Sequence, residues 1–427
     1  MRRSGYNSVL TAIDRVVEQT RLLAPEMAGF LQEITRIPTV NPPGECYADF
    51  AEVCERYYRN AGYDVQRVVA EEHPDHTADH PRINLLARMN GDKGNSPCVH
   101  FNGHLDVVPV GEGWTRDPFG GEIAGDRLYG RGTTDMKAGL AASLYAIEAI
   151  RRAGIRLPGA LEQSATVDEE SGGFAGVAYL AEHGYLNPER QQHVIITEPH
   201  GPDRICLGHR GVWWFDVVVH GHIAHGSMPF NGINAVDRMT ELISAVNSQL
   251  RPRLAGRMTA MPVAPGGARY PTLNINSIFA GQPIEQRQTP CVPDRCTAIF
   301  DRRFLPEEDL AEVKREFAHF LAETGVPHEI RERMTVMPTF TPQDSPVSMA
   351  VAGAISEVCG KPAEYMASPG TYDQKHFVRI AKIDDCISYG PGVLDMAHQP
   401  DEYVSLKDME ASATVMALAT LRLMGLT

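Results

Sequence analysis

Two stretches, CVHFNGHLD at residues 98–106 and GRGTTDMKAGLAASLYAIEAIRRAG at residues 130–154, indicate the fold of this chain. The first opens on apolar and β-branched residues over 98–104, which predicts a short strand. The second carries apolar residues at helical spacing from 136 to 153 and stops at Gly154, which predicts a helix with a left-handed cap. A strand followed by a helix is the unit from which an α/β sheet is built.

The same alternation continues on both sides of these stretches. We predict further strands at 83–89, 161–167 and 193–197 and further helices at 49–61, 346–358 and 408–423. An α+β pattern lies between them, with strands predicted at 213–220, 272–279, 296–302 and 330–337 and helices at 235–250 and from Pro306 onward. The sequence thus predicts an α/β catalytic domain, with a mixed sheet flanked by helices, at 1–209 and 336–427. An inserted domain of β-α-β-β-α-β type is expected at 210–335.

Composition limits the possible partners. At 427 residues the chain exceeds what one hydrophobic core usually serves, in agreement with two domains. Its formal charge of -14 would repel a phosphate backbone, so we expect no nucleic-acid partner. The apolar runs are shorter than a bilayer span, and residues 1–7 lead into a polar stretch. We therefore expect a cytoplasmic protein with no membrane partner.

A histidine and two aspartates are the first candidates for chemistry. His104 and Asp106 stand two residues apart and point to one side of an extended chain, so Asp106 can accept a hydrogen bond from His104. Taken alone, this pair is typical of a histidine satisfied by a neighbouring carboxylate, so the other motifs must decide. Asp135 lies in a glycine-flanked turn before a predicted helix, where an N-cap is the ordinary alternative.

Further candidates follow the ends of other predicted strands. Asp168, Glu169 and Glu170 come directly after an apolar strand, where buried adjacent acids are costly without cations. Each of them alone could lie in a solvated loop. Glu198 ends the next strand, and His398 lies in a turn-rich loop before the last helix. Because strand ends meet at one edge of an α/β sheet, the set as a whole predicts a metal site.

These motifs resemble those of the acetylornithine deacetylase, succinyl-diaminopimelate desuccinylase and aminoacylase family of two-metal amidohydrolases and peptidases. The resemblance covers nearly the whole chain and rests on GHLDVVP at 103–109, GRGTTDMKAG at 130–139, DEE at 168–170, EP at 198–199 and AHQPDE at 397–402. It implies a hydrolase of a C–N bond in a small carboxylate-bearing molecule. The most direct reaction is deacylation of an N-acyl amino acid or related amide by metal-activated water.

The resemblance also implies a set of metal ligands. Asp135 would bridge two divalent ions, with His104 and Glu198 completing one site and Glu170 and His398 the other. Nitrogen and oxygen donors without sulfur suit Zn²⁺ and also admit Co²⁺ or Mn²⁺.

Other residues receive roles by the same resemblance. Glu169 is the implied general base, and Asp106 would orient the histidine of the first site. His225 matches a histidine of the inserted domain that reaches the active site of a neighbouring subunit, which implies a homodimer. Asn274 and Arg303 match positions that hold the substrate carboxylate. A polar loop residue remains the alternative for His225, and a surface salt bridge for Arg303.

Two stretches depart from the family pattern. RQTPCVP at 287–293 lacks an asparagine that contacts the substrate, and GTYDQ at 370–374 places Tyr372 near Gly370 in a loop expected to face the substrate. These departures leave an alternative reaction open, the hydrolytic deamination of an amino-aromatic acid with release of ammonia. A non-catalytic binding protein on the same fold is a third alternative, against which the retained Glu169 argues.

Overall fold

The computed structural model describes residues 11–94, 96–281 and 291–427 and divides into two compact units. The first comprises Met1–Leu207, Thr341–Tyr365 and Tyr372–Thr427, and the second comprises Gly208–Phe340 and Met366–Thr371. Within the described ranges, no helix is both long and apolar enough to cross a membrane.

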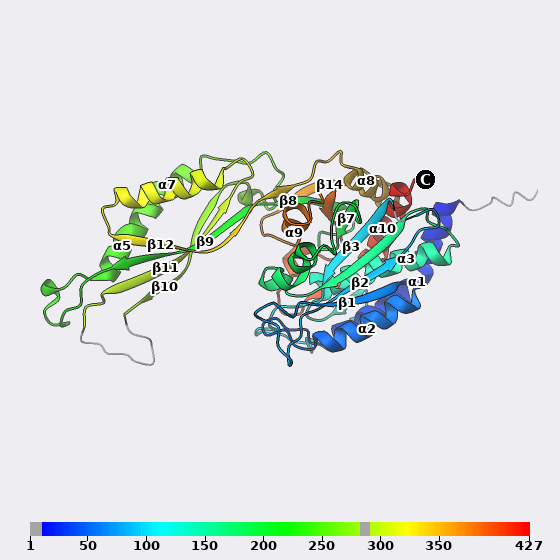
Figure 1. Cartoon of the computed structure of the whole chain (residues 1–427), viewed down its shortest axis with the longest axis horizontal. Helices are drawn as coiled ribbons and strands as arrows, with labels where there is room; N and C mark the ends of the chain where they lie inside the picture. The colour runs from blue at the N-terminus through cyan, green and yellow to red at the C-terminus, as the bar shows by residue number, and fades with distance from the viewer. Residues whose placement is uncertain (1–10, 95, 282–290) are drawn as a thin grey trace, which may run out of the picture. The chain divides into compact units, whose positions relative to one another are not determined.

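The first unit is built on a mixed sheet with the strand order β1-β2-β6-β3-β7-β15-β8. Figure 1 labels β1, β2, β3, β7 and β8 of this sheet. The strands are β1 Asp64–Val69, β2 Ile83–Met89, β3 Cys98–His104, β6 Ala160–Thr166, β7 His193–Ile196, β8 Arg204–His209 and β15 Cys386–Ser388. Strands β3, β6, β7 and β15 run parallel, whereas β1, β2 and β8 pair with their neighbours antiparallel. The carboxyl ends of the parallel strands therefore meet at one edge of the sheet.

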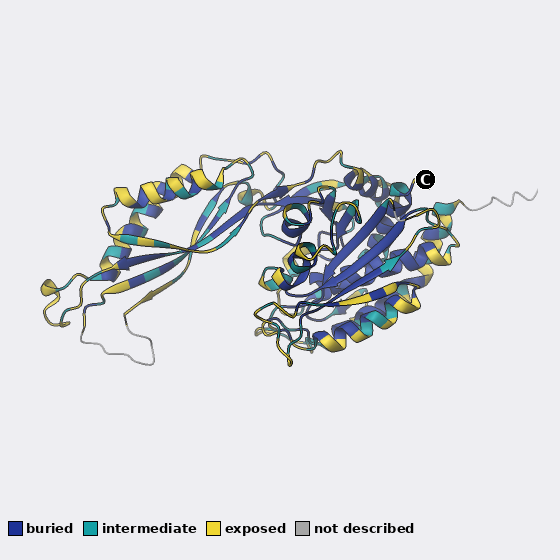
Figure 2. Cartoon of the chain, in the orientation of Figure 1, coloured by how far each residue is buried: buried dark blue, intermediate teal, exposed yellow. Residues whose placement is uncertain are grey.

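Helices cover one face of this sheet with a continuous apolar core. They are α1 Ala12–Thr35, α2 Tyr47–Asn60, α3 Ala138–Arg152, α8 Pro346–Cys359 and α10 Leu406–Leu423. Val99 and Phe101 of β3 belong to this core. His100 alternates to the opposite face, where its ring contacts Phe377 of α9 (Gln374–Arg379). Figure 2 shows the buried sheet and the exposed outer sides of α1 and α2.

Smaller elements complete the first unit. They are β4 Glu122–Ala124, β5 Arg127–Tyr129 and β16 Tyr403–Ser405, which form a three-stranded sheet, and the short helix α4 Tyr179–Glu182. The chain passes between the units near β13 (Thr339–Phe340) and β14 (Glu364–Ser368).

Helix α3 approaches β7 closely through a glycine. A Cβ atom added at Gly139 would lie 2.1 Å from the backbone oxygen of Thr197, the residue after β7. That distance is shorter than any real contact, so only glycine allows the helix and the strand end to approach in this way. The approach matters for the site because Asp135 precedes α3 and Glu198 follows Thr197.

Replacing Gly139 with alanine is expected to lower the free energy of unfolding by about 1–3 kcal/mol, because backbone atoms must move to admit the methyl group. Urea unfolding measures the loss. Gly29→Ala in α1 is the matched control, since an added Cβ there meets no atom within 4 Å. Alanine at that position should raise the free energy of unfolding by up to about 1 kcal/mol. Equal effects of the two substitutions would argue against the close approach.

The second unit is a four-stranded antiparallel sheet in the order β10-β11-β9-β12. Its elements in chain order are β9 Gly211–His220, α5 Ala235–Ala245, α6 Arg251–Leu254, β10 Thr272–Ala280, β11 Arg295–Phe304, α7 Leu310–Glu323 and β12 His328–Val336. Side chains of α5 and α7 share one apolar core with the sheet, and the ring of Phe317 packs against those of Phe215 and Phe300. This is the β-α-β-β-α-β succession that the sequence predicts.

The structure confirms the α/β prediction and corrects two details. The helix expected from Pro306 begins only at Leu310, because Asp309 caps it by accepting a hydrogen bond from the backbone N–H of Glu312. The predicted helix at 136–153 is preceded by a separate wide turn, Thr133–Lys137, before α3 begins at Ala138. Asp135 lies in this turn, in a non-helical conformation.

Candidate metal centre

The parallel strands bring the predicted ligands to one edge of the first unit. His104 is the last residue of β3, Glu170 follows β6, and Glu198 follows β7. His398 lies in the loop between β15 and β16. Asp135 comes from the turn that precedes α3. Five side chains that are distant in sequence therefore meet where strands of one direction end.

The first cluster consists of His104, Asp135 and Glu198, whose ligand atoms all lie within 4.8 Å of one another. All three residues are buried. The Nδ1 atom of His104 donates to the backbone oxygen of Asp106 at 2.9 Å, and its Nε2 atom lies 3.1 Å from Asp135 Oδ1. Because Nδ1 is the donor, Nε2 can offer its lone pair to a metal ion.

The second cluster consists of Asp135, Glu170 and His398, again within 4.8 Å of one another. His398 Nε2 lies 3.0 Å from Glu170 Oε1 and 3.5 Å from Asp135 Oδ2. Asp135 thus turns one carboxylate oxygen toward each cluster. Two nitrogen and oxygen donor sets that share a carboxylate fit a pair of divalent cations.

The loop after β6 is fixed in a conformation that directs its acids toward the edge of the sheet. Asp168 has a left-handed φ of 62°, and its carboxylate accepts hydrogen bonds from Tyr47 at 2.8 Å and Arg82 at 2.7 Å. Such a conformation is costly for a residue other than glycine and needs contacts that hold it. The two acids that follow Asp168 are positioned by these contacts.

Asp106 contributes differently from the expectation. Its carboxylate accepts the backbone N–H groups of Glu169 at 3.2 Å and Glu170 at 3.1 Å, together with the side-chain amide of Asn41. His104 bonds to the backbone carbonyl of Asp106, while the carboxylate oxygen Oδ1 lies farther away, at 3.5 Å. The side chain of Asp106 therefore holds the acidic loop more directly than it holds His104.

Glu169 lies beside both clusters but belongs to neither. Its Oε1 atom is 3.5 Å from the Nζ atom of Lys375, and both side chains are largely buried, with exposed fractions of 12% and 5%. The ion pair fixes a carboxylate next to the ligands without making it one of them. That is the placement a general base requires.

Several ionisable groups of the clusters have raised pKa values, which favours their protonated forms when no cation is bound. Burial raises the pKa of Glu170 to about 7 and raises that of Glu198 well above its usual value. Hydrogen bonds to Asp135 and Glu170 raise the pKa of His398 to about 10. Divalent ions would replace these protons and compensate the same negative charge.

The affinity for Zn²⁺ is accordingly expected to rise with pH. Glu170 and His398 have raised pKa values, so both carry protons near pH 7 that the metal must displace. For each proton that the metal displaces, the affinity is expected to rise about tenfold per pH unit. The rise ends at the pH where that group is already deprotonated in the metal-free protein. Titration calorimetry at about pH 6 and about pH 8 measures the change. Equal affinity at the two pH values would contradict the displacement of protons.

Comparison with known proteins identifies the family. Residues 100–422 match the model of peptidase family M20/M25/M40. The chain belongs to this family. A succinyl-diaminopimelate desuccinylase of Xanthobacter autotrophicus is 29% identical over 90% of this chain and 95% of its own length. One from Methylobacterium radiotolerans is 31% identical over 91% and 94%.

A solved structure agrees with the fold of this M20/M25/M40 member. The di-peptidase Dug1p of Saccharomyces cerevisiae superposes with a TM-score of 0.75, covers 97% of this chain and 99% of its own, and is 17% identical. The family resemblance inferred from the sequence is therefore confirmed. The chain is a metal-dependent hydrolase that acts on C–N bonds.

Other residues singled out from the sequence lie in the second unit of this hydrolase. His225 is exposed and bonds to Ser227, and Asn274 is exposed and donates to Asn276. Arg303 forms an ion pair with Asp301 at 2.7 Å, as in the salt-bridge alternative. All three positions belong to the second unit and none is a member of a ligand cluster, so their roles at the site stay predictions.

The departures from the family pattern have different surroundings. Tyr372 is buried, and its hydroxyl donates to Gln374 at 3.0 Å. Gly370 belongs to the second unit and bonds to Ser368. Residues 287–290 of the other departure lie outside the described residues. The burial of Tyr372 shows that an aromatic side chain in this loop can serve packing.

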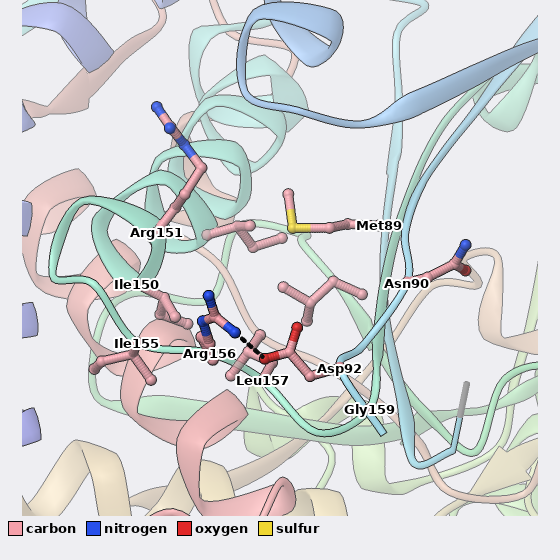
Figure 3. Close-up of a pocket in the computed structure, with 11 residues that line it drawn as sticks. Met89, Asn90, Asp92, Ile150, Arg151, Ile155, Arg156, Leu157 and Gly159 are labelled. Atoms are coloured by element: carbon pink, nitrogen blue, oxygen red, sulfur yellow. Dashed lines mark ion pairs between the residues drawn. The ribbon is translucent and has the colours of Figure 1, made fainter. Parts of the chain in front are cut away.

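Two further places are weaker candidates for a site. Figure 3 shows a hollow beside Met89 at the end of β2, where an exposed ion pair joins Arg156 and Asp92 at 3.7 Å. It lies at the start of β6, the end opposite to the metal ligands. The loop at 73–80 places His73 and Asp75 near Asp168, but Asp168 is already paired with Arg82. Neither place has the shared buried carboxylate of the metal centre.

Proposed function

We propose that this M20/M25/M40 hydrolase cleaves the amide bond of an N-acyl amino acid or a similar small amide that carries a carboxylate. The observation that carries the proposal is the position of Asp135, whose two carboxylate oxygens face separate ligand clusters. Relatives named as desuccinylases support removal of an acyl group. The first cluster also places two carboxylates, those of Asp135 and Glu198, in a buried position where a cation would compensate their charge.

The proposed metal ligands are His104, Asp135 and Glu198 for one ion and Asp135, Glu170 and His398 for the other. When bound, two such ions polarise a carbonyl group and lower the pKa of water toward about 7. Glu169 accepts a proton from the attacking water and passes it to the departing amine. The donor set favours Zn²⁺, with Co²⁺ or Mn²⁺ as alternatives.

The proposed enzyme is a homodimer that acts on a small molecule in the cytoplasm. Apolar side chains are exposed around His225, which supports burial of this segment by a second subunit. They are Ile223, Met228, Phe230, Ile233 and Val236. Phe230 is 80% exposed, which is unusual for so large an apolar side chain. Asn274, Arg303, Gly370 and Tyr372 remain the proposed substrate contacts.

Replacing His225 with alanine is expected to lower kcat by about 10²–10³-fold, because a donor to the developing oxyanion is lost. The free energy of unfolding should stay unchanged, since His225 is exposed. His222→Ala, at another exposed histidine of the same segment, is the matched control and should retain activity. Mixing His225→Ala subunits with Glu169→Gln subunits should restore part of the activity, because one site of the mixed dimer is then complete. Unchanged kinetics of His225→Ala would refute the role across the interface.

A substrate panel tests the reaction itself. Protein supplied with Zn²⁺, Co²⁺ or Mn²⁺ is incubated with N-succinyl and N-acetyl amino acids and with amino-aromatic acids. We expect release of a carboxylic acid and a primary amine without ammonia. Release of ammonia from an amino-aromatic acid, with no cleavage of the amides, would instead establish hydrolytic deamination.

A further inference from the structure

A buried ion pair next to the ligand clusters joins two segments that are distant in sequence. Arg131 lies in the turn before α3, and Glu402 lies directly before β16. The NH1 atom of Arg131 is 2.6 Å from Glu402 Oε2, and the exposed fractions of the two side chains are 2% and 0%. Neither residue is a member of a cluster of potential ligands. Among the described residues, the two terminal nitrogens of Arg131 have hydrogen-bond partners and its buried Nε atom has none, so the terminal nitrogens carry the contacts of this pair.

Glu402 uses its second oxygen to hold the backbone of the bridging ligand. Its Oε1 atom accepts the backbone N–H groups of Thr134 at 2.9 Å and Asp135 at 3.1 Å. These groups belong to the wide turn, in which Asp135 has a non-helical conformation. The carboxylate of Glu402 therefore fixes the main chain from which the shared ligand projects.

Arg131 holds the backbone of the second histidine. Its NH2 atom donates to the carbonyl oxygen of His398 at 3.3 Å, and its NH1 atom donates to that of Gln399 at 3.3 Å. His398 has a left-handed φ of 64°, a conformation that a histidine keeps only when surrounding contacts impose it. The two hydrogen bonds from the guanidinium group hold the carbonyl groups of His398 and Gln399, next to this conformation.

We propose that Arg131 and Glu402 are positioning residues that link the two metal sites. Glu402 acts on both sites because it holds Asp135, and Arg131 acts on the second site because it holds His398. The proposal rests on the two-metal function proposed above. It goes beyond that function because it makes the metal affinities of both sites depend on the ion pair between Arg131 and Glu402, neither of which is a proposed metal ligand.

Titration of metal-free protein with Zn²⁺ tests the proposal without any substrate. Glu402→Gln keeps the shape of the side chain and removes its charge, so we expect binding about 10–100-fold weaker at both sites. Arg131→Lys keeps the charge but lacks the planar set of donors that reaches the His398 carbonyl, so the weakening should be confined to one of the two ions. Glu308→Gln is the matched control. Glu308 is paired with Arg302 at 2.7 Å, with exposed fractions of 10% and 4%, and it lies in the second unit, which contains none of the ligands.

Thermal unfolding of the metal-free variants separates positioning from general loss of stability. Glu402→Gln and Glu308→Gln should both unfold at lower temperature, and only Glu402→Gln should bind Zn²⁺ more weakly. If Glu402→Gln does not fold, Arg131→Lys decides the matter. Wild-type affinity in the folded variants would overturn the proposal. Failure of this proposal can be distinguished from failure of the proposed function. A wild-type protein that binds two ions but cleaves no amide would contradict the proposed function and leave the positioning role intact.

Discussion

Replacing Glu169 with glutamine is expected to lower kcat by about 10²–10⁴-fold while both metal ions stay bound. Glutamine has the same shape but cannot accept the proton of the attacking water. Because Glu169 lies outside both ligand clusters, its replacement removes no metal donor. The ion pair with Lys375 is lost, yet the backbone of the loop stays fixed by Asp106. Steady-state kinetics and metal analysis of the same preparation measure the two quantities.

The control for this experiment is Glu182→Gln, an exposed glutamate at the end of α4. It carries the same change of charge and is expected to keep wild-type kcat and metal content. Loss of metal by Glu169→Gln would mean that Glu169 is a ligand. Retention of full activity would remove it from the role of general base.

Asparagine in place of Asp135 is expected to affect both metal sites together. The amide keeps one oxygen but loses the charge, and its nitrogen cannot serve as a ligand at the second site. Replacement of an outer-shell partner typically costs about 10–100-fold in metal affinity, and loss of a shared ligand should exceed that range. Turnover should fall with metal content. Metal analysis after equilibration with excess Zn²⁺ measures the loss.

His398, which belongs to only the second cluster, provides the comparison for the metal content of the Asp135 variant. His398→Ala removes a donor of the second cluster, while His104, Asp135 and Glu198 of the first remain. We expect this variant to retain one tightly bound ion. If Asp135→Asn and His398→Ala lose the same single ion, Asp135 does not bridge.

The spacing of apolar residues in the sequence is sufficient to predict those helices and strands in which the apolar residues are also the buried ones. Strands β2 and β3 have the bounds expected from the sequence, because each carries apolar residues and is largely buried along its length. Helix α1 was not predicted as an element, although Thr11 and Asp14 form a capping box at its start. Because proline is common at a helix start, the sequence predicts a helix from Pro306, whereas the cap is Asp309 and α7 begins at Leu310.

The ligands could be predicted because their motifs are short and lie either at the ends of predicted strands or in turns that precede predicted helices. The contacts that hold them could not, because they join distant segments through backbone groups. Glu402 bonds to the N–H of Asp135, and the Asp106 carboxylate bonds to the N–H groups of Glu169 and Glu170. No spacing in the sequence indicates which main-chain groups a carboxylate will accept. Arg131 and Glu402 lie within the motifs, but only the fold brings them together.

The most direct test of the central claim is X-ray diffraction from crystals grown with Zn²⁺, recorded at the zinc absorption edge. The account predicts two anomalous peaks in each subunit, one on either side of the Asp135 carboxylate. One peak should lie beside His104 and Glu198, and the other beside Glu170 and His398. A single peak, or peaks away from Asp135, would contradict the two-metal centre.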